Sequence, residues 1–109
     1  MPAARLVLVT HPTRGARAFA QRLVKERLAA CVNLVPVGSL YRWRGTLESA
    51  RETLLVIKTA AARVRALERF VTSEHPYACP EFVVLTPAHV ALRYGAWLAA
   101  ETRTRGRPR

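Results

Sequence analysis

The sequence contains no aspartate and only two cysteines, Cys31 and Cys79. Two cysteines so far apart do not form the framework of a disulfide-rich domain. Neither belongs to a CxxC pair, which argues against a structural zinc site. No apolar run approaches the ~20 residues that cross a bilayer, and the first ten residues lack the layout of a signal peptide. We therefore expect a cytoplasmic protein without a membrane partner.

The motifs of familiar enzymes are missing as well. The sequence has no recognisable serine–histidine–acid set, no glycine-rich phosphate loop and no helical metal-hydrolase motif. A catalytic site of one of these types would need such a pattern. The sequence therefore predicts a protein that is not an enzyme and requires no cofactor.

Acidic residues are scarce, and the formal net charge is +11. Four of the positive charges are the arginines of the C-terminal stretch "RTRGRPR", without which the charge is +7. The other arginines are spread along the chain rather than gathered in one block. A solvated basic surface is the preferred interpretation, and an RNA-associated basic protein is the weaker alternative.

The chain has 109 residues, of which 50% are hydrophobic, and this length accommodates one domain with a real core. We assign residues 1–102 to a single globular domain. The arginine-rich residues 103–109 are expected to form a disordered basic tail.

Hydrophobic periodicity predicts the first half of the fold. The β-branched run Arg5 to Thr10 favours a buried strand, and apolar residues at intervals of three and four favour a helix from Ala16 to about Ala30. Residues 31–49 are typical of extended chain, in which Pro36 and Gly38 indicate a bulge, a kink or an edge position.

The second half repeats this order of elements. The stretch "ESAR", residues 48–51, is interpreted as a turn, and the strand Glu52 to Ala60 then completes an antiparallel hairpin. Residues 64–71 indicate a second helix, which Pro76 ends before His75. Residues 81–87 are predicted as the fourth strand, and a last helix begins near residue 89.

Two βαβ units predict an α+β, ferredoxin-like sandwich, with an antiparallel sheet and the main helices on one face. Alternate residues of the strands would leave an apolar surface on the other face. The last helix is also apolar on more than one side. Large uncovered apolar surfaces indicate a partner, and self-association is the simplest one.

Four stretches carry a resemblance to a known family. They are "ERLAACVNLVPVGSLYRWRGTLES", "ETLLVIKT", "HPYACPEFVVL" and "YGAWL". In this order and spacing they resemble the CutA family, the divalent-ion tolerance proteins, from about Arg5 to Ala100. The resemblance implies a ferredoxin-like subunit in a tight homotrimer, with hairpin strands pairing across subunit boundaries.

The same resemblance leaves two functions open. The first is a binding or regulatory role in tolerance to copper or another divalent cation. The second is a signalling role like that of the PII proteins, which are similar in architecture and bind small ligands in clefts between subunits.

The histidine of "HPY", His75, is the best metal-ligand candidate that the resemblance implies, because histidine suits borderline metals. Copper-binding relatives can have a cysteine and a second histidine where this chain has Val9 and Glu74. His11, Cys79 or Glu81 would then have to substitute. The alternative is that His75 is a hydrogen-bonded histidine at a helix-to-strand corner.

Cys31 is a further candidate ligand, although a buried small hydrophobe is the preferred interpretation for it. The resemblance also implies an inter-subunit cleft, with a pocket for a small anion or a metal. The alternative is a set of buried salt bridges and aromatic anchors that set the subunit register. The candidate cleft residues are Tyr41, Trp43, Glu48, Glu52, Lys58, Tyr77 and Glu81.

Overall fold

The computed structural model of the protein describes residues 3–104. Residues 105–109 lie outside this part, so most of the predicted basic tail is not described. The elements in chain order are β1 (Ala4–Pro12), α1 (Thr13–Lys25), β2 (Cys31–Trp43), β3 (Thr46–Ala60), a 3₁₀ turn (Ala61–Arg63), α2 (Val64–Glu74), β4 (Val83–Leu85) and α3 (Leu92–Glu101).

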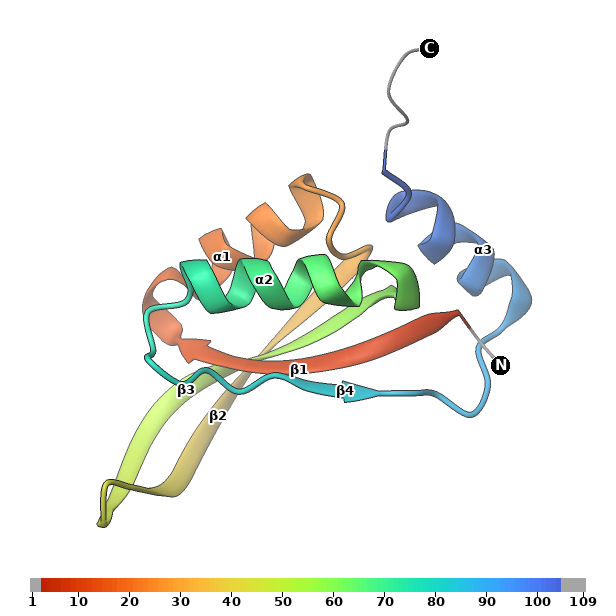
Figure 1. Ribbon diagram of the computed structural model, residues 1–109. Helices are drawn as coiled ribbons and strands as arrows, with labels where there is room; N and C mark the ends of the chain where they lie inside the picture. Colours follow the sequence, from red (N-terminus) through yellow and green to blue (C-terminus); the bar gives the residue numbers. More distant parts are fainter. Residues whose placement is uncertain (1–2, 105–109) are drawn as a thin grey trace.

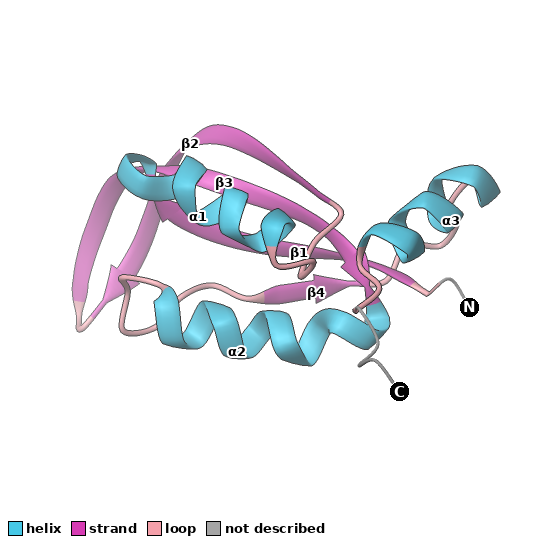
Figure 2. Cartoon of the chain, turned by 90° about the horizontal axis from the view of Figure 1, so that it is seen from above, coloured by secondary structure: helices cyan, strands magenta, loops and turns pink. Residues whose placement is uncertain are grey.

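The four strands form one antiparallel sheet in the order β2-β3-β1-β4. Figure 1 shows α1 and α2 together on one face of this sheet. Seen from above in Figure 2, α1 lies toward β2 and β3 and α2 lies toward β4, while α3 lies at one end of the sheet. This arrangement confirms the ferredoxin-like fold predicted from the two βαβ units.

The core lies between the sheet and the two helices. Val7 and Val9 of β1 pair with Ile57 and Leu55 of β3, and all four side chains are fully buried. Phe19 and Leu23 of α1 and Leu67 and Val71 of α2 pack against them. The apolar side chains that recur at every second position of the strands therefore pack against those that recur at every third or fourth position of the helices.

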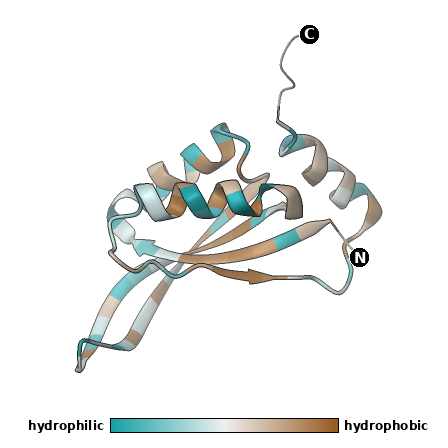
Figure 3. Ribbon diagram, in the orientation of Figure 1, coloured by the Kyte–Doolittle hydropathy of each residue, from teal (hydrophilic) through white to brown (hydrophobic). Residues whose placement is uncertain are grey.

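In the part of the chain that the structure describes, the opposite surface carries no helix (Figure 1), and we call it the helix-free face. Strand alternation directs every second side chain toward it. These residues are largely apolar and only half-buried or exposed, namely Leu6, Leu8, Val35, Leu54, Val56, Val83 and Leu85. Figure 3 shows the hydrophobic character of β4 and of much of β1. The predicted apolar surface is thus confirmed in the single chain.

Helix α1 ends at Lys25, so the predicted end near Ala30 was wrong. The cause is a Schellman-type C-cap: Arg27 has φ 58°, and the Leu28 amide donates to the Leu23 carbonyl at 2.9 Å. Glycine usually takes this left-handed position, and because position 27 is an arginine, the sequence did not indicate the end of the helix. Leu28 and Ala29 are nevertheless buried in the core, which explains why the apolar period continues beyond the helix.

The hairpin turn consists of Arg44 and Gly45, so the predicted turn at residues 48–51 was wrong. Their φ values of 50° and 81° are those of a tight hairpin turn with two left-handed residues. Residues 48–51 instead lie within β3, which is 15 residues long. Polar side chains are compatible with a strand here because this part of the hairpin extends beyond the helices.

Pro36 and Gly38 lie in β2, which is the outer strand of the sheet. The edge position, one of the three predicted possibilities, is therefore the observed one. Proline is tolerated there because its missing amide can face away from the paired strand.

Strand β4 covers residues 83–85 only, shorter than the predicted 81–87, because it pairs with β1 at three positions. Helix α3 begins at Leu92, later than predicted. Within residues 3–104, no helix combines the length and the apolar character required to span a membrane.

Candidate functional site

A groove of about 860 Å³ lies between the β2–β3 hairpin and the corner that follows α2. We call it the hairpin groove. Its walls are residues 38–41, 43, 44, 48 and 52 of the hairpin and residues 76–81 of the corner, with Thr10 at the end of β1. Two segments distant in the sequence thus enclose one site.

The hairpin groove brings together most of the predicted cleft residues. Its lining includes Tyr41, Trp43, Glu48, Glu52, Tyr77 and Glu81, as well as the candidate ligand Cys79. Lys58 and Cys31 lie outside it, near the other end of the hairpin. They occupy directly paired positions of β3 and β2, with Lys58 Nζ 3.9 Å from Cys31 Sγ.

Strand register explains the hairpin wall. Tyr41 of β2 is paired with Glu48 of β3, and Trp43 and Glu52 have the same parity along their strands. Because side chains alternate between the two faces, all four lie on the helix-free side. Tyr41 and Trp43 are each 42% exposed, so their rings are accessible from the groove.

Among the described residues, one side-chain hydrogen bond joins the corner wall to the hairpin. The Tyr77 hydroxyl donates a hydrogen bond of 2.7 Å to Glu52 Oε2. Glu52 is a buried residue with only 5% exposure. Burial, the largest cause, and the hydrogen bond to the Glu52 carboxylate together raise the pKa of Tyr77 to about 12. Tyr77 is therefore a constant hydrogen-bond donor at neutral pH.

His75 lies beneath the corner and is buried at 8% exposure. The Tyr77 amide donates to Nδ1 at 3.0 Å, so Nδ1 is the acceptor, and Nε2–H then donates to the Thr10 carbonyl at 2.7 Å. Burial is the main cause that lowers the pKa of His75, and it outweighs the hydrogen bond to Thr10. The imidazole is thus neutral, and both of its nitrogens have partners.

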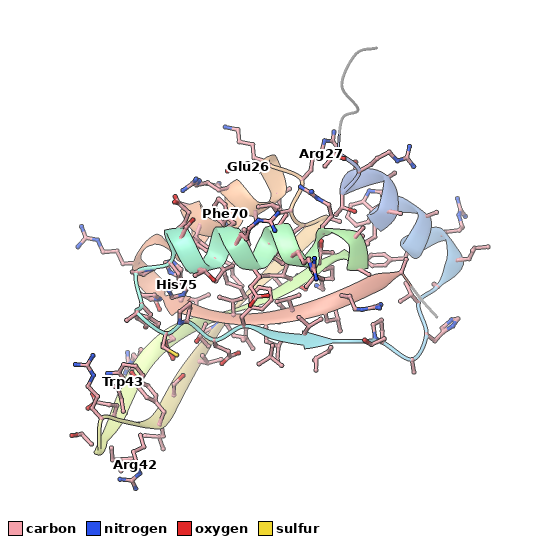
Figure 4. All side chains as sticks on the ribbon, viewed as in Figure 1. Glu26, Arg27, Arg42, Trp43, Phe70 and His75 are labelled. Carbon is pink, nitrogen blue, oxygen red and sulfur yellow. The ribbon has the colours of Figure 1, made fainter. Side chains whose placement is uncertain are left out.

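Aromatic rings hold His75 in place. The ring of His11 lies 4.8 Å from it, that of Tyr77 also 4.8 Å and that of Phe19 5.7 Å, measured between centroids. Figure 4 shows His75 near the end of α2 and Trp43 far out on the hairpin. This packing is that of the hydrogen-bonded corner histidine considered as the alternative to a metal ligand.

Within the described residues, the other candidate donors do not complete a three-ligand metal site with His75, although the His11 ring packs against it. His11 is buried, and its Nδ1 donates to the Pro12 carbonyl at 2.8 Å. Glu74 forms an exposed ion pair of 2.8 Å with Arg22, and Val9 is a core residue. Within residues 3–104, no three histidine, cysteine or glutamate side chains are grouped closely enough to hold a metal ion. The donor set as arranged does not fit a preformed metal site.

Sequence reasoning missed Arg44 as a groove residue. Its guanidinium carbon lies 5.5 Å from the centre of the Trp43 ring, within cation–π range. The available signal was the dipeptide Arg44–Gly45, since glycine at the second central position is typical of a two-residue hairpin turn.

Comparisons with known proteins agree with the fold and with the motifs. The family model described as "CutA1 divalent ion tolerance protein" matches residues 5–101. The divalent-cation tolerance protein CutA of Thermus thermophilus is 43% identical over 99 residues, which cover 89% of this chain and 96% of that protein.

Solved structures give the same result. CutA from Synechococcus elongatus matches with a TM-score of 0.90 and 38% identity, covering 94% of this chain and 93% of its own. A protein from Nostoc sp. described as "PII-like protein CutA" matches with a TM-score of 0.88 and 33% identity, covering 91% and 97%. The chain therefore belongs to the CutA family of divalent-ion tolerance proteins.

Proposed function

We propose that this protein acts in divalent-cation tolerance as a homotrimer that binds its ligand and does not transform it. The observation that carries the proposal is the helix-free face, which is apolar and has no covering layer in the single chain. Apolar surfaces of this extent mark interaction sites in soluble proteins. A second copy of the chain offers the same apolar surface in return.

Helix α3 adds to the apolar surface available for association. Leu92 is 87% exposed, and the rings of Tyr94 and Trp97 lie 5.5 Å apart with less than half of each residue exposed. Aromatic residues of this kind are enriched at subunit interfaces. They agree with the prediction that the last helix packs against another subunit.

The edge of the sheet supports the same arrangement. The outer edge of β2 has no neighbouring strand in the described part of the chain. Such an edge presents unpaired amides and carbonyls to any strand that approaches it. Pairing across subunit boundaries would satisfy these groups.

The oligomeric state is the direct test. Light scattering on the purified protein is expected to give three times the chain mass of 12.2 kDa. A stable species with the mass of one chain would contradict the proposal.

For the metal-binding part of the proposal, His75 is the ligand to test first. A metal ion would have to displace the Tyr77 amide from Nδ1 or the Thr10 carbonyl from Nε2. We therefore expect weak binding of Cu(I), Cu(II) or Zn(II) in calorimetric titrations, and its loss in His75→Ala. His89→Ala, at an exposed position, is the matched control. Equal binding by both variants would exclude His75.

A second candidate function is a PII-like signalling module that binds a small ligand. The hairpin groove favours it, because about 860 Å³ falls within the usual volume of small-molecule sites. The test is a thermal-shift panel of nucleotides, small anions and small organic cations. A flat response to all three classes would contradict this function.

A further inference from the structure

The positive charge of the folded chain is concentrated on the layer formed by α1 and α2. We call residues 13–27 and 61–74, which include both helices and the turns beside them, the helix layer. It contains eight basic and three acidic residues and therefore carries +5, whereas the other residues of 1–102 together carry +2. The tertiary structure thus gathers on one face basic residues that are dispersed along the sequence (Figure 1).

Most of the basic side chains of the helix layer are available to a ligand. Two of its three acids are already neutralised, because Glu26 and Glu74 both pair with Arg22, and only Glu68 is outside the ion pairs of the described part. Five basic residues are exposed and form no ion pair or side-chain hydrogen bond within residues 3–104, namely Arg14, Arg17, Lys25, Arg65 and Arg69.

Helical spacing directs the two arginines of α2 away from the core. Arg65 and Arg69 each lie two positions before a buried residue, Leu67 or Val71, and two positions correspond to about 200° around a helix. Side chains four residues apart on a helix are neighbours. The two guanidinium groups therefore form one outward-facing pair.

The helix layer is not the face through which we expect the chain to associate. The helix-free face lies on the other side of the sheet (Figure 1). The proposed homotrimer, built through that face, would leave three helix layers on its outside, facing in different directions. A flat membrane could not contact all three layers, whereas a flexible polyanion could.

The arginines of the C-terminal stretch begin next to the helix layer. Arg27 Nη1 donates to the Glu101 carbonyl at 3.1 Å, which places the end of α3 beside the end of α1. Residues 103–109 follow directly and contain four more arginines. Their charge has the same sign as that of the layer and would favour the same ligand.

The chemistry of the helix layer suits phosphate groups rather than bases. Guanidinium groups bind phosphate oxygens through paired hydrogen bonds. The layer exposes no aromatic ring for a base to stack on, because Phe19 is buried and Phe70 is half-buried, with the Arg22 guanidinium carbon 4.6 Å from its ring centre. Such a surface offers contacts to a backbone and none that would read a sequence.

We propose that the helix layer binds the phosphate backbone of single-stranded nucleic acid, RNA or DNA, without preference for sequence. This activity goes beyond the proposed function and uses the face that the proposed assembly leaves accessible.

The test is fluorescence anisotropy of short labelled single strands of RNA and DNA, titrated with the full chain at several salt concentrations. Arg65→Gln/Arg69→Gln should weaken binding roughly fivefold or more and reduce the slope of log K against log salt by about 0.7 for each lost phosphate contact. Glu68→Gln should strengthen binding, an effect that a folding defect cannot imitate. Arg42→Gln/Arg51→Gln is the matched control, because it removes the same charge from exposed positions of the hairpin, where Figure 4 shows Arg42 far from the helices. It should leave the salt slope unchanged.

Each other outcome has a defined meaning. Similar affinities for RNA and DNA of unrelated sequences would support the proposal, and dependence on one sequence or one sugar would overturn it. Equal weakening by both double variants would show nonspecific charge attraction and would overturn the assignment to the helix layer. A loss confined to a variant with glutamine at positions 103, 105, 107 and 109 would assign binding to the C-terminal stretch and would also overturn it.

Other polyanions provide the last comparison. Binding to phosphatidylserine vesicles or to polyglutamate, without binding to nucleic acid, would contradict the proposal. Light scattering on the same samples reports the oligomeric state separately, so a failure of nucleic-acid binding is distinguishable from a failure of the proposed homotrimer.

Discussion

The Tyr77 hydroxyl donates a hydrogen bond of 2.7 Å to Glu52 Oε2, and this contact joins the corner after α2 to strand β3. The two residues are 25 positions apart in the chain. On one side of Tyr77 its amide holds His75 in a single tautomer, and on the other its hydroxyl partners a buried carboxylate. The corner and the groove are therefore one connected structure.

Removing this hydroxyl should destabilise the protein. Tyr77→Phe leaves the buried Glu52 carboxylate without its donor, and we expect a loss of about 1–3 kcal/mol in the free energy of unfolding. Urea denaturation followed by circular dichroism measures the loss. Tyr94→Phe is the control, because no hydrogen bond is formed by the Tyr94 hydroxyl within the described residues. Equal stability of Tyr77→Phe and the wild type would show that the bond contributes nothing.

Stability should fall in mild acid because of His75. Its pKa is lowered from 6.5, mainly by burial, so the unfolded chain binds a proton that the folded chain resists. The contribution is fully present above pH 6.5 and is lost as the pH falls toward the folded-state pKa. The neighbouring His11 acts in the same direction, and Glu52 opposes it.

The measurement is urea denaturation at pH 7.5 and pH 5. The wild type should lose more stability between these values than His75→Gln does, whereas His89→Gln should behave like the wild type. An identical pH dependence in all three proteins would contradict the role of His75.

The hairpin should tolerate substitution of Gly38 in strand β2 but not of Gly45 in the turn. Gly45 has φ 81°, a conformation that an L side chain adopts only with strain, so Gly45→Ala should cost about 1 kcal/mol or more. Gly38→Ala is the control, because a Cβ there meets no atom within 4 Å and φ is not positive. Thermal unfolding of the two variants should separate them, and a lower transition for Gly38→Ala than for Gly45→Ala would contradict the turn.

The helix-free face should govern assembly. Val83 is 45% exposed on β4, and its pairing with Leu8 places it on this face. Val83→Glu should shift the light-scattering mass toward that of one chain, since a buried unpaired charge is costly. Val24→Glu changes a residue of similar exposure, 43%, on α1, which lies on the opposite face of the sheet, and it should leave the mass unchanged. The same mass for both variants would contradict the assignment of the interface.

Much of the fold could be predicted because it depends on local periodicity. Alternation along β1 and β3 and the three-to-four-residue spacing in α1 and α2 predicted the order of the elements and both faces of the sheet. The end of α1 and the hairpin turn were missed for one shared reason. Arg27 and Arg44 adopt left-handed backbone angles, which are most often found at glycine or asparagine and are therefore not expected at arginine.

The candidate site was only partly predictable. The motifs indicated Tyr41, Trp43, Glu48, Glu52, Tyr77 and Glu81, and the structure places all six in the hairpin groove. The position of Lys58 and Cys31 at the other end of the hairpin depends on strand length and register, which the misplaced turn obscured.

By itself, the sequence determined the ferredoxin-like order of strands and helices, because that order follows from local hydrophobic periodicity. It also determined the membership of the CutA family, because the family is recognised by short motifs. The tertiary structure alone decided that His75 has both nitrogens bonded and that Glu52 is buried beside Tyr77. Two of these contacts, His75 with Thr10 and Tyr77 with Glu52, join residues 65 and 25 positions apart, and they form only when distant segments of the chain pack together.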